Sequence, residues 1–181
     1  MHEVELTAIT RTSHKAPKRI RTSYSTLGTL EPEILQAEAT IFRYVSITEA
    51  YIDALSSELM SNAMPYSNPL VKILIEEYEI QTTSNWERRH EKFSKIHSIR
   101  LKECSEWNKV NAAIEVRNTI AHGLGRLTPL QQKKANIASA LSAIGVSIDA
   151  GRVRLTLATA RTVRDACRAF IRSVDQKCPL G

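Results

Sequence analysis

The chain has 181 residues, of which 43% are hydrophobic and 24% charged, a balance that suits one folded domain of ordinary size. Only six glycines and six prolines are present, which argues against a loop-rich all-β fold. The longest apolar stretches, such as residues 73–75, are too short for a membrane-spanning helix. Cys104, Cys167 and Cys178 lack the spacing of a disulfide framework or a zinc site. We therefore expect a cytoplasmic globular protein.

The net charge of +6 is unevenly distributed along the chain. Residues 31–62 carry six acidic side chains and one basic one, whereas residues 110–181 carry eleven basic and four acidic side chains. A basic C-terminal half suits a polyanionic partner such as RNA or DNA. Alternatively, arginines such as Arg161 and Arg172 simply solvate the outer face of one helix. Charge alone does not separate the two interpretations.

The sequence divides into three parts. Residues 1–29 are rich in Ser, Thr, Lys and Arg without a sustained period, and we expect a flexible basic arm. Residues 30–176 carry helical periodicity and are expected to form one helical domain, followed by a tail over residues 177–181.

Three helices are predicted in the first half of the domain. The first covers residues 32–61, where apolar side chains recur at three- and four-residue spacing and Pro32 suits the first turn. The second opens at Asn68-Pro69 and runs through Tyr78. The third opens at Ser84, because Ser84 and Glu87 match a capping box.

A fourth helix is predicted over residues 105–122, with a stop at Gly123 and Gly125. A fifth begins at Thr128-Pro129 and ends at Gly145.

Residues 146–157 then change from helical to alternating periodicity, interrupted by Asp149-Ala150-Gly151, which predicts a small β-hairpin. A last helix follows over residues 160–174. The predicted fold class is mainly all-α: a bundle of five to six helices with one short β-hairpin before the last helix.

The fourth helix ends in the string Arg-Asn-Thr-Ile-Ala-His-Gly, which places Arg117, Asn118 and His122 in its last turns. This string resembles the signature of the HEPN superfamily (higher eukaryote and prokaryote nucleotide-binding domains). That signature is Arg, a polar residue that is often Asn, three more residues, and His. HEPN domains are helical bundles with a long first helix, and their motif lies at the end of a later helix, as expected here.

The resemblance implies a function. Many HEPN proteins are metal-independent endoribonucleases that act as homodimers, often as toxins or in antiviral defence. It implies that Arg117 and His122 are catalytic with support from Asn118, that RNA is the substrate, and that no metal or cofactor is needed. HEPN toxins controlled by a nucleotidyltransferase antitoxin carry Tyr two positions after the His. Here that position is Leu124, so an antitoxin or other regulatory partner would act differently.

These residue types suit RNA cleavage, in which the 2′-hydroxyl attacks phosphorus and the 5′-oxygen leaves with a proton. A histidine with a pKa of about 6.5 can accept or donate that proton, and the arginine fork binds phosphate oxygens. Asn118 can bind phosphate or orient the imidazole. Two alternatives stay open. The helix dipole favours His122 at this position in any case, and Arg117 can pair with Glu49 or Asp53 of the first helix.

Four residues share one side of the fourth helix: Trp107, Asn111, Ile114 and Asn118. An apolar stripe interrupted by two asparagines is poor core material. We therefore expect it to be a homodimer interface that brings two Arg/His pairs together. RNA contacts are expected from the basic residues after the motif, which are Arg126, Lys133 and Lys134.

Two other functions remain open. The chain can be a non-catalytic HEPN module that binds RNA or docks on a partner protein. A weaker alternative is a DNA-binding regulator, because Gly145-Val146-Ser147 faintly suggests the turn of a helix-turn-helix. His90 and His97 are expected to be packed or solvated, since no acidic residue or cysteine completes a metal-ligand set. Trp86 and Trp107 are expected to anchor the core or an interface.

Overall fold

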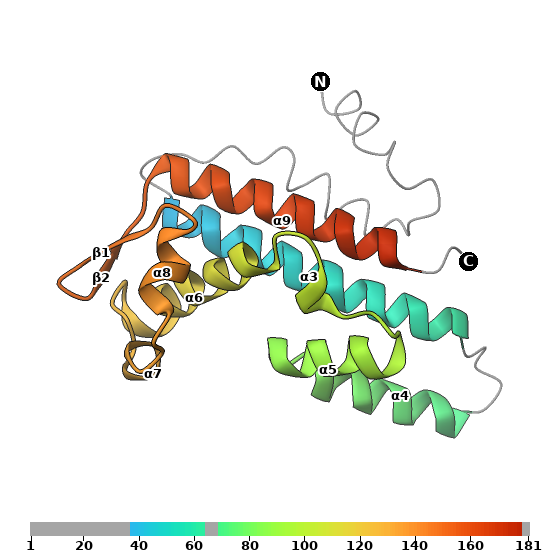
Figure 1. Cartoon of the computed structure of the whole chain (residues 1–181). Helices are drawn as coiled ribbons and strands as arrows, with labels where there is room; N and C mark the ends of the chain where they lie inside the picture. The colour runs from blue at the N-terminus through green and yellow to red at the C-terminus, as the bar shows by residue number, and fades with distance from the viewer. Residues whose placement is uncertain (1–36, 64–68, 179–181) are drawn as a thin grey trace.

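A computed structural model describes residues 37–63 and 69–178 (Figure 1). Its elements, in chain order, are α3 (Ala37–Ala63), α4 (Pro69–Thr82), α5 (Trp86–Ile96), the 3₁₀ turn η3 (Leu101–Glu103), α6 (Trp107–Gly123), α7 (Pro129–Gln132), α8 (Ile137–Ser142), β1 (Ser147–Asp149), β2 (Arg152–Arg154) and α9 (Leu157–Lys177). The predicted fold class, a mainly helical bundle with a short hairpin before the last helix, is confirmed. The basic arm and residues 32–36 of the predicted first helix lie outside the described residues, as do residues 179–181 of the tail.

The core lies where α3, α6 and α9 pack against one another, with α3 and α9 side by side along much of their length (Figure 1). Apolar side chains at three- and four-residue spacing give each long helix one face to bury. The largest fully buried side chains include Tyr44 and Tyr51 of α3 and Phe170 and Ile171 of α9. No described helix is long and apolar enough to span a membrane.

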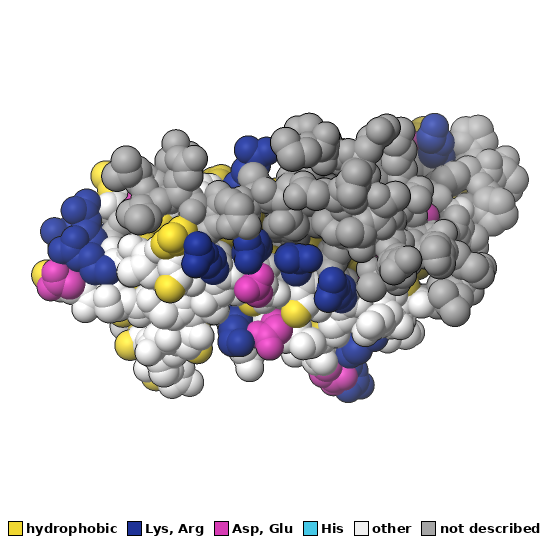
Figure 2. Space-filling view, turned by 90° about the horizontal axis from the view of Figure 1, so that it is seen from above, with side chains coloured by type: hydrophobic (Ala, Val, Ile, Leu, Met, Phe, Trp, Pro, Cys, Tyr) yellow, Lys and Arg dark blue, Asp and Glu magenta, His cyan; other side chains and the backbone are white. Residues whose placement is uncertain are grey.

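The outer side of α9 carries arginines, as one of the charge interpretations expected. Arg161 and Arg172 are exposed, whereas Arg164 and Arg168 are half-buried. The face seen from above in Figure 2 carries Lys and Arg side chains with Asp and Glu among them. This face is therefore one of mixed charge.

The third predicted helix, α5, begins at Trp86. Its N-cap is Asn85, whose Oδ1 accepts a 2.9 Å hydrogen bond from the Arg88 N–H. The predicted capping box of Ser84 and Glu87 is therefore wrong, because Asn is as good an N-cap as Ser and stands one residue closer to the helix. Two 2.8 Å hydrogen bonds from Arg89 to Asp53 then tie α5 to α3.

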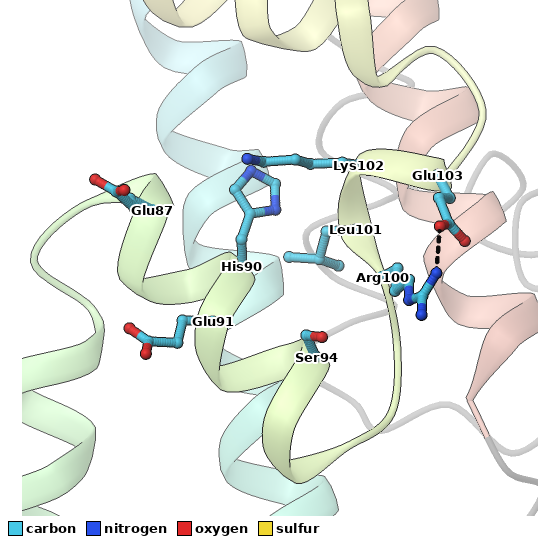
Figure 3. A pocket seen from close by; sticks show the side chains of 8 residues that line it. All are labelled: Glu87, His90, Glu91, Ser94, Arg100, Leu101, Lys102 and Glu103. Atoms are coloured by element: carbon cyan, nitrogen blue, oxygen red, sulfur yellow. Dashed lines mark hydrogen bonds and ion pairs between the residues drawn. The ribbon is translucent and has the colours of Figure 1, made fainter.

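Helix α5 and the turn η3 line an open pocket of about 520 Å³ (Figure 3). It is lined by Glu87, His90, Glu91, Ser94, Arg100, Leu101, Lys102 and Glu103. The neighbouring helix α4 contacts α5 and buries Ile75. Helix α4 leaves exposed a set of apolar side chains, which are Leu70, Val71, Ile73, Leu74, Tyr78 and Ile80.

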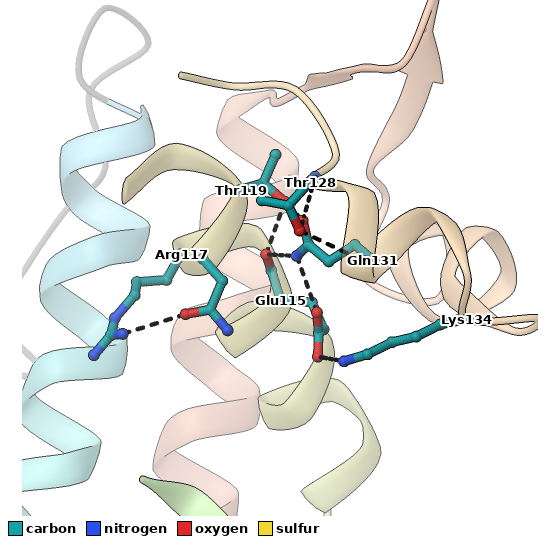
Figure 4. Close-up of polar contacts among 7 residues, drawn as sticks. Glu115, Arg117, Thr119, Thr128, Gln131 and Lys134 are labelled. Atoms are coloured by element: carbon teal, nitrogen blue, oxygen red, sulfur yellow. Dashed lines mark hydrogen bonds and ion pairs between the residues drawn. The ribbon is translucent and has the colours of Figure 1, made fainter. Parts of the chain in front are cut away.

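The predicted fifth helix is two short helices, α7 and α8. Thr128 caps α7 in a capping box with Gln131. The Gln131 amide nitrogen donates to the Glu115 backbone carbonyl and carboxylate at 2.8 and 2.9 Å, and Lys134 Nζ donates to the same carboxylate at 2.5 Å (Figure 4). Because these bonds tie the end of α7 to the buried Glu115 of α6, the chain turns before α8 instead of continuing as one helix.

The predicted hairpin is present. Strands β1 and β2 pair antiparallel, with Ile148 opposite Val153. Ala150 and Gly151 join them with φ angles of +47° and +76°, the signs that a type I′ turn requires. A helix-turn-helix would need a recognition helix after Gly145, where the chain instead forms this hairpin. The weaker alternative of a helix-turn-helix DNA reader is therefore wrong.

Candidate functional site

The motif residues lie in the last two turns of α6. His122 is exposed, Asn118 is half-buried, and the Arg117 side chain is 26% exposed. The helix ends at Gly123, and Leu124 follows with a left-handed φ of +50°. Glycine is the usual residue in this conformation, and the sequence predicted that Gly123 and Gly125 would end the helix. A leucine there is strained, and its side chain is 84% exposed.

Arg117 contacts three side chains from two helices, α3 and α6. Its Nη2 donates to Glu49 Oε2 of α3 at 2.9 Å, and its Nη1 donates to Asn118 Oδ1 at 3.3 Å. Its guanidinium carbon lies 5.6 Å from the centre of the Phe42 ring. The alternative in which Arg117 pairs with an acid of the first helix is confirmed for Glu49, whereas Asp53 pairs with Arg89.

Glu49 joins three helices. Its side chain is only 14% exposed, and its second oxygen, Oε1, accepts a 2.9 Å hydrogen bond from Trp86 Nε1 of α5. The carboxylate therefore satisfies Arg117 of α6 and Trp86 of α5 at once. This arrangement fixes the direction of the guanidinium, and it also neutralises its charge.

Asn118 orients the arginine. Because its amide oxygen accepts from Arg117, its NH₂ group is the part left to donate to a ligand. No hydrogen bond joins Asn118 to His122 within the described part of the chain. No contact therefore supports the predicted role in orienting the imidazole, and the binding of a phosphate oxygen by Asn118 stays a prediction.

His122 is the exposed side chain of the candidate site. It lies five residues after Arg117, and it forms no hydrogen bond or ion pair with any residue that the structure describes. An unengaged imidazole in the last turn of a helix can approach a substrate from solvent, and both of its nitrogens stay available for proton transfer.

The predicted dimer interface needs correction. Trp107 and Ile114 are only 8% and 6% exposed, because α6 packs on α3 and α9 within the protomer. The Trp107 ring lies 5.2 Å from that of Trp86 and 5.6 Å from that of Phe170, measured between centroids. The apolar part of the stripe is thus core, and Trp86 and Trp107 anchor it. Of the remaining two predicted residues, Asn118 is half-buried and Asn111 is exposed.

The three predicted RNA contacts differ in their surroundings. Arg126 and Lys133 are exposed, whereas Lys134 is engaged by the buried Glu115 carboxylate. The sequence reasoning missed Arg152, which pairs with Arg126 in an antiparallel β-bridge. The signal that pointed to it is the alternation of Arg152 and Arg154 in the predicted second strand, with their side chains on its polar face.

His90 of α5 packs against the other end of α6. Its ring lies 4.3 Å from that of Trp107, the first residue of the helix, whereas the motif lies at the last turn. Both ring nitrogens are buried without a hydrogen-bond partner among the described residues. Burial, together with the Lys102 cation, lowers the pKa of His90 to about 4. His90 therefore stays neutral at physiological pH as part of the packing.

Within residues 37–63 and 69–178, no three His, Cys, Asp or Glu side chains gather where they could hold a metal ion. The groups at the end of α6 are a guanidinium held by Glu49 and Asn118, a half-buried amide and an exposed imidazole. Comparison of the chain with protein-family models, with curated proteins and with solved structures found no match.

Proposed function

We propose that this protein is a metal-independent endoribonuclease with Arg117 and His122 as catalytic residues and Asn118 in a supporting role. The observation that carries the proposal is the exposed His122 at the end of the helix in which Glu49 and Asn118 hold Arg117 in place. The resemblance of the motif to the HEPN signature adds the biological setting, a toxin or a component of antiviral defence.

The reaction needs one anion-binding group and one group that moves protons. The 2′-oxygen forms a bond to the adjacent phosphorus as the bond to the 5′-oxygen breaks, which leaves a cyclic 2′,3′-phosphate and a 5′-hydroxyl. The Nη N–H groups of Arg117 that Glu49 and Asn118 do not use, together with the Asn118 NH₂ group, bind the non-bridging oxygens. His122 takes the proton from the 2′-hydroxyl or gives one to the 5′-oxygen.

Each protomer offers one such imidazole, so a homodimer that brings two sites together would provide one histidine for each proton transfer. Trp107 and Ile114 are not available for that contact. The exposed apolar side chains that lie next to the motif in the chain are Leu124 and Leu130, 84% and 75% exposed, and they are the candidates for the dimer contact. A regulatory protein would compete for the same surface.

The test is cleavage of a single-stranded RNA in EDTA by the wild type and by His122→Ala and Arg117→Ala. Cyclic 2′,3′-phosphate ends are expected, and the loss of His122 should lower the rate about 10²- to 10⁴-fold. Arg172→Ala, an exposed change on α9, is the matched control for the arginine. Activity that needs a divalent metal, or that survives both changes, contradicts the proposal.

The Arg117–Glu49 ion pair favours a second candidate, a module that binds RNA or a partner protein without cleaving it. A guanidinium already neutralised by a carboxylate can serve the fold alone, and RNA would then be held by the exposed basic residues. RNA binding that weakens steeply with salt and yields no product under any condition would select this candidate.

A further inference from the structure

Two arginines face each other where the chain leaves α6 and meets the hairpin. Arg126 and Arg152 are partners in an antiparallel bridge, flanked by 2.9 Å hydrogen bonds from the Leu127 N–H to the Gly151 carbonyl and from the Val153 N–H to the Gly125 carbonyl. This is the pattern of a non-hydrogen-bonded pair, in which the two side chains leave the same face at close range.

Neither guanidinium forms an ion pair with a described carboxylate. Arg126 Nη1 donates to the Ala150 carbonyl at 3.1 Å, and Arg152 Nη2 donates to the Leu124 carbonyl at 3.4 Å. The acid within the hairpin, Asp149, pairs instead with Arg154 at 2.9 Å. Glu38 Oε1 of α3 and Arg152 Nε both lie within 4 Å of the position that a side chain at Gly125 would occupy, but Glu38 forms no ion pair with either arginine. Backbone carbonyls thus orient both cations, and no carboxylate pairs with them among the described residues.

Like charges directly opposite each other destabilise a strand pair. Both side chains are exposed, so water screens part of this repulsion but supplies no counter-charge. An anion held between the two forks would remove the repulsion and accept several charge-assisted hydrogen bonds. At the hairpin end of the molecule, Figure 2 shows Lys and Arg side chains gathered beside a smaller acidic group.

We propose that Arg126 and Arg152 form a phosphate-binding site for the RNA backbone, adjacent to the phosphate that is cleaved. The inference rests on the proposed function, which supplies RNA as the substrate. It adds a phosphate anchor, formed by Arg126 and Arg152, that holds the RNA strand. The Arg126 N–H bonds to the Gly123 carbonyl at 2.9 Å, so the anchor directly follows the helix end that carries His122. The anchor recognises phosphate groups, so it should bind RNA and single-stranded DNA equally well.

The test measures binding of a fluorescently labelled single-stranded RNA to the full chain in a His122→Ala background, which prevents cleavage during the titration. Arg126→Gln combined with Arg152→Gln is expected to weaken binding at least about tenfold and to lower the salt slope by about one for each lost contact. The matched control, Arg172→Gln on α9, should change affinity less than about twofold. A DNA oligonucleotide of the same sequence should lose affinity in parallel.

Affinity of the double variant within about twofold of the control would overturn the anchor, as would a loss with RNA but not with DNA. Arg126→Lys combined with Arg152→Lys should bind RNA more tightly than the double Gln variant but less tightly than the wild-type arginines. Lysine restores the positive charges but not the bidentate hydrogen bonding of a guanidinium. Binding through the two arginines without cleavage by the wild type would refute the ribonuclease and leave the anchor standing. Cleavage with an unchanged KM in the double variant would refute the anchor alone.

Discussion

The body of α6 and its C-terminal end use the same residue types in different ways. In the body, Glu115 and Arg117 are bound to partners from α7 and α3, and Ile114 is buried. In the last turn and just after the helix, His122 and Arg126 are exposed and have no carboxylate partner among the described residues. The comparison teaches that the fold decides how much of a charged residue is left for a ligand: Arg117 already donates to Glu49 and Asn118, whereas His122 forms no hydrogen bond or ion pair with a described residue.

The largest expected effect tests whether the body of α6 is core. Ile114→Asp should destabilise the protein by about 4 kcal/mol or more, because it buries a carboxylate without a partner. Asn111→Asp, an exposed change on the same helix, is the control and should have little effect. Denaturant unfolding measures both. A folded, stable Ile114→Asp protein with an altered oligomeric state would instead restore the dimer-interface interpretation.

The next largest effect is expected for Glu49→Ala, which should lower the free energy of unfolding by about 3 kcal/mol. It leaves Arg117 and the Trp86 N–H without their shared acceptor in a half-buried place. Glu91→Ala removes an ion pair with Lys95 on the surface of α5, and we expect no measurable change there. Equal unfolding midpoints for the two variants would show that the Glu49 bridge does not stabilise the fold.

The N-terminal end of α6 should show a pH effect through His90. Its folded-state pKa of about 4 lies below the ordinary value of 6.5, so the unfolded chain binds the proton more readily between these values. Stability should therefore fall as pH decreases from 6.5 towards 4, by on the order of 1 kcal/mol after allowance for solvent screening. His90→Phe should flatten this dependence, measured by denaturant unfolding at several pH values. Parallel profiles for the two proteins would contradict it.

The smallest expected effect concerns Leu124, at the C-terminal end of α6. Leu124→Gly should stabilise the protein by about 0.5 kcal/mol, because glycine adopts the left-handed conformation without strain and little burial is lost. Thermal unfolding would measure it, with Leu130→Gly as a destabilising control in α7. If Leu124→Gly lowers the melting temperature as Leu130→Gly does, the strain at the helix end is absent.

Much of the fold could be predicted because it depends on neighbours along the chain. Helix positions follow from apolar spacing, and the hairpin follows from Ala150-Gly151, which can adopt the two positive φ angles of its turn. The N-cap of α5 was misplaced by one residue because Ser84 and Asn85 are equally good caps. The motif that defines the candidate site was also readable, since it occupies consecutive residues of one helix.

Only the tertiary structure decided which residues meet. An apolar stripe broken by asparagines looks the same whether its cover is a second protomer or, as for Ile114, the helices of its own chain. Helix periodicity allowed Arg117 to pair with either Glu49 or Asp53. In the structure Asp53 pairs with Arg89 of α5, and Arg117 pairs with Glu49. Arg152 met Arg126 because the hairpin folds back on the end of α6. Backbone geometry sets local periodicity, but pairing across the chain depends on how whole elements pack.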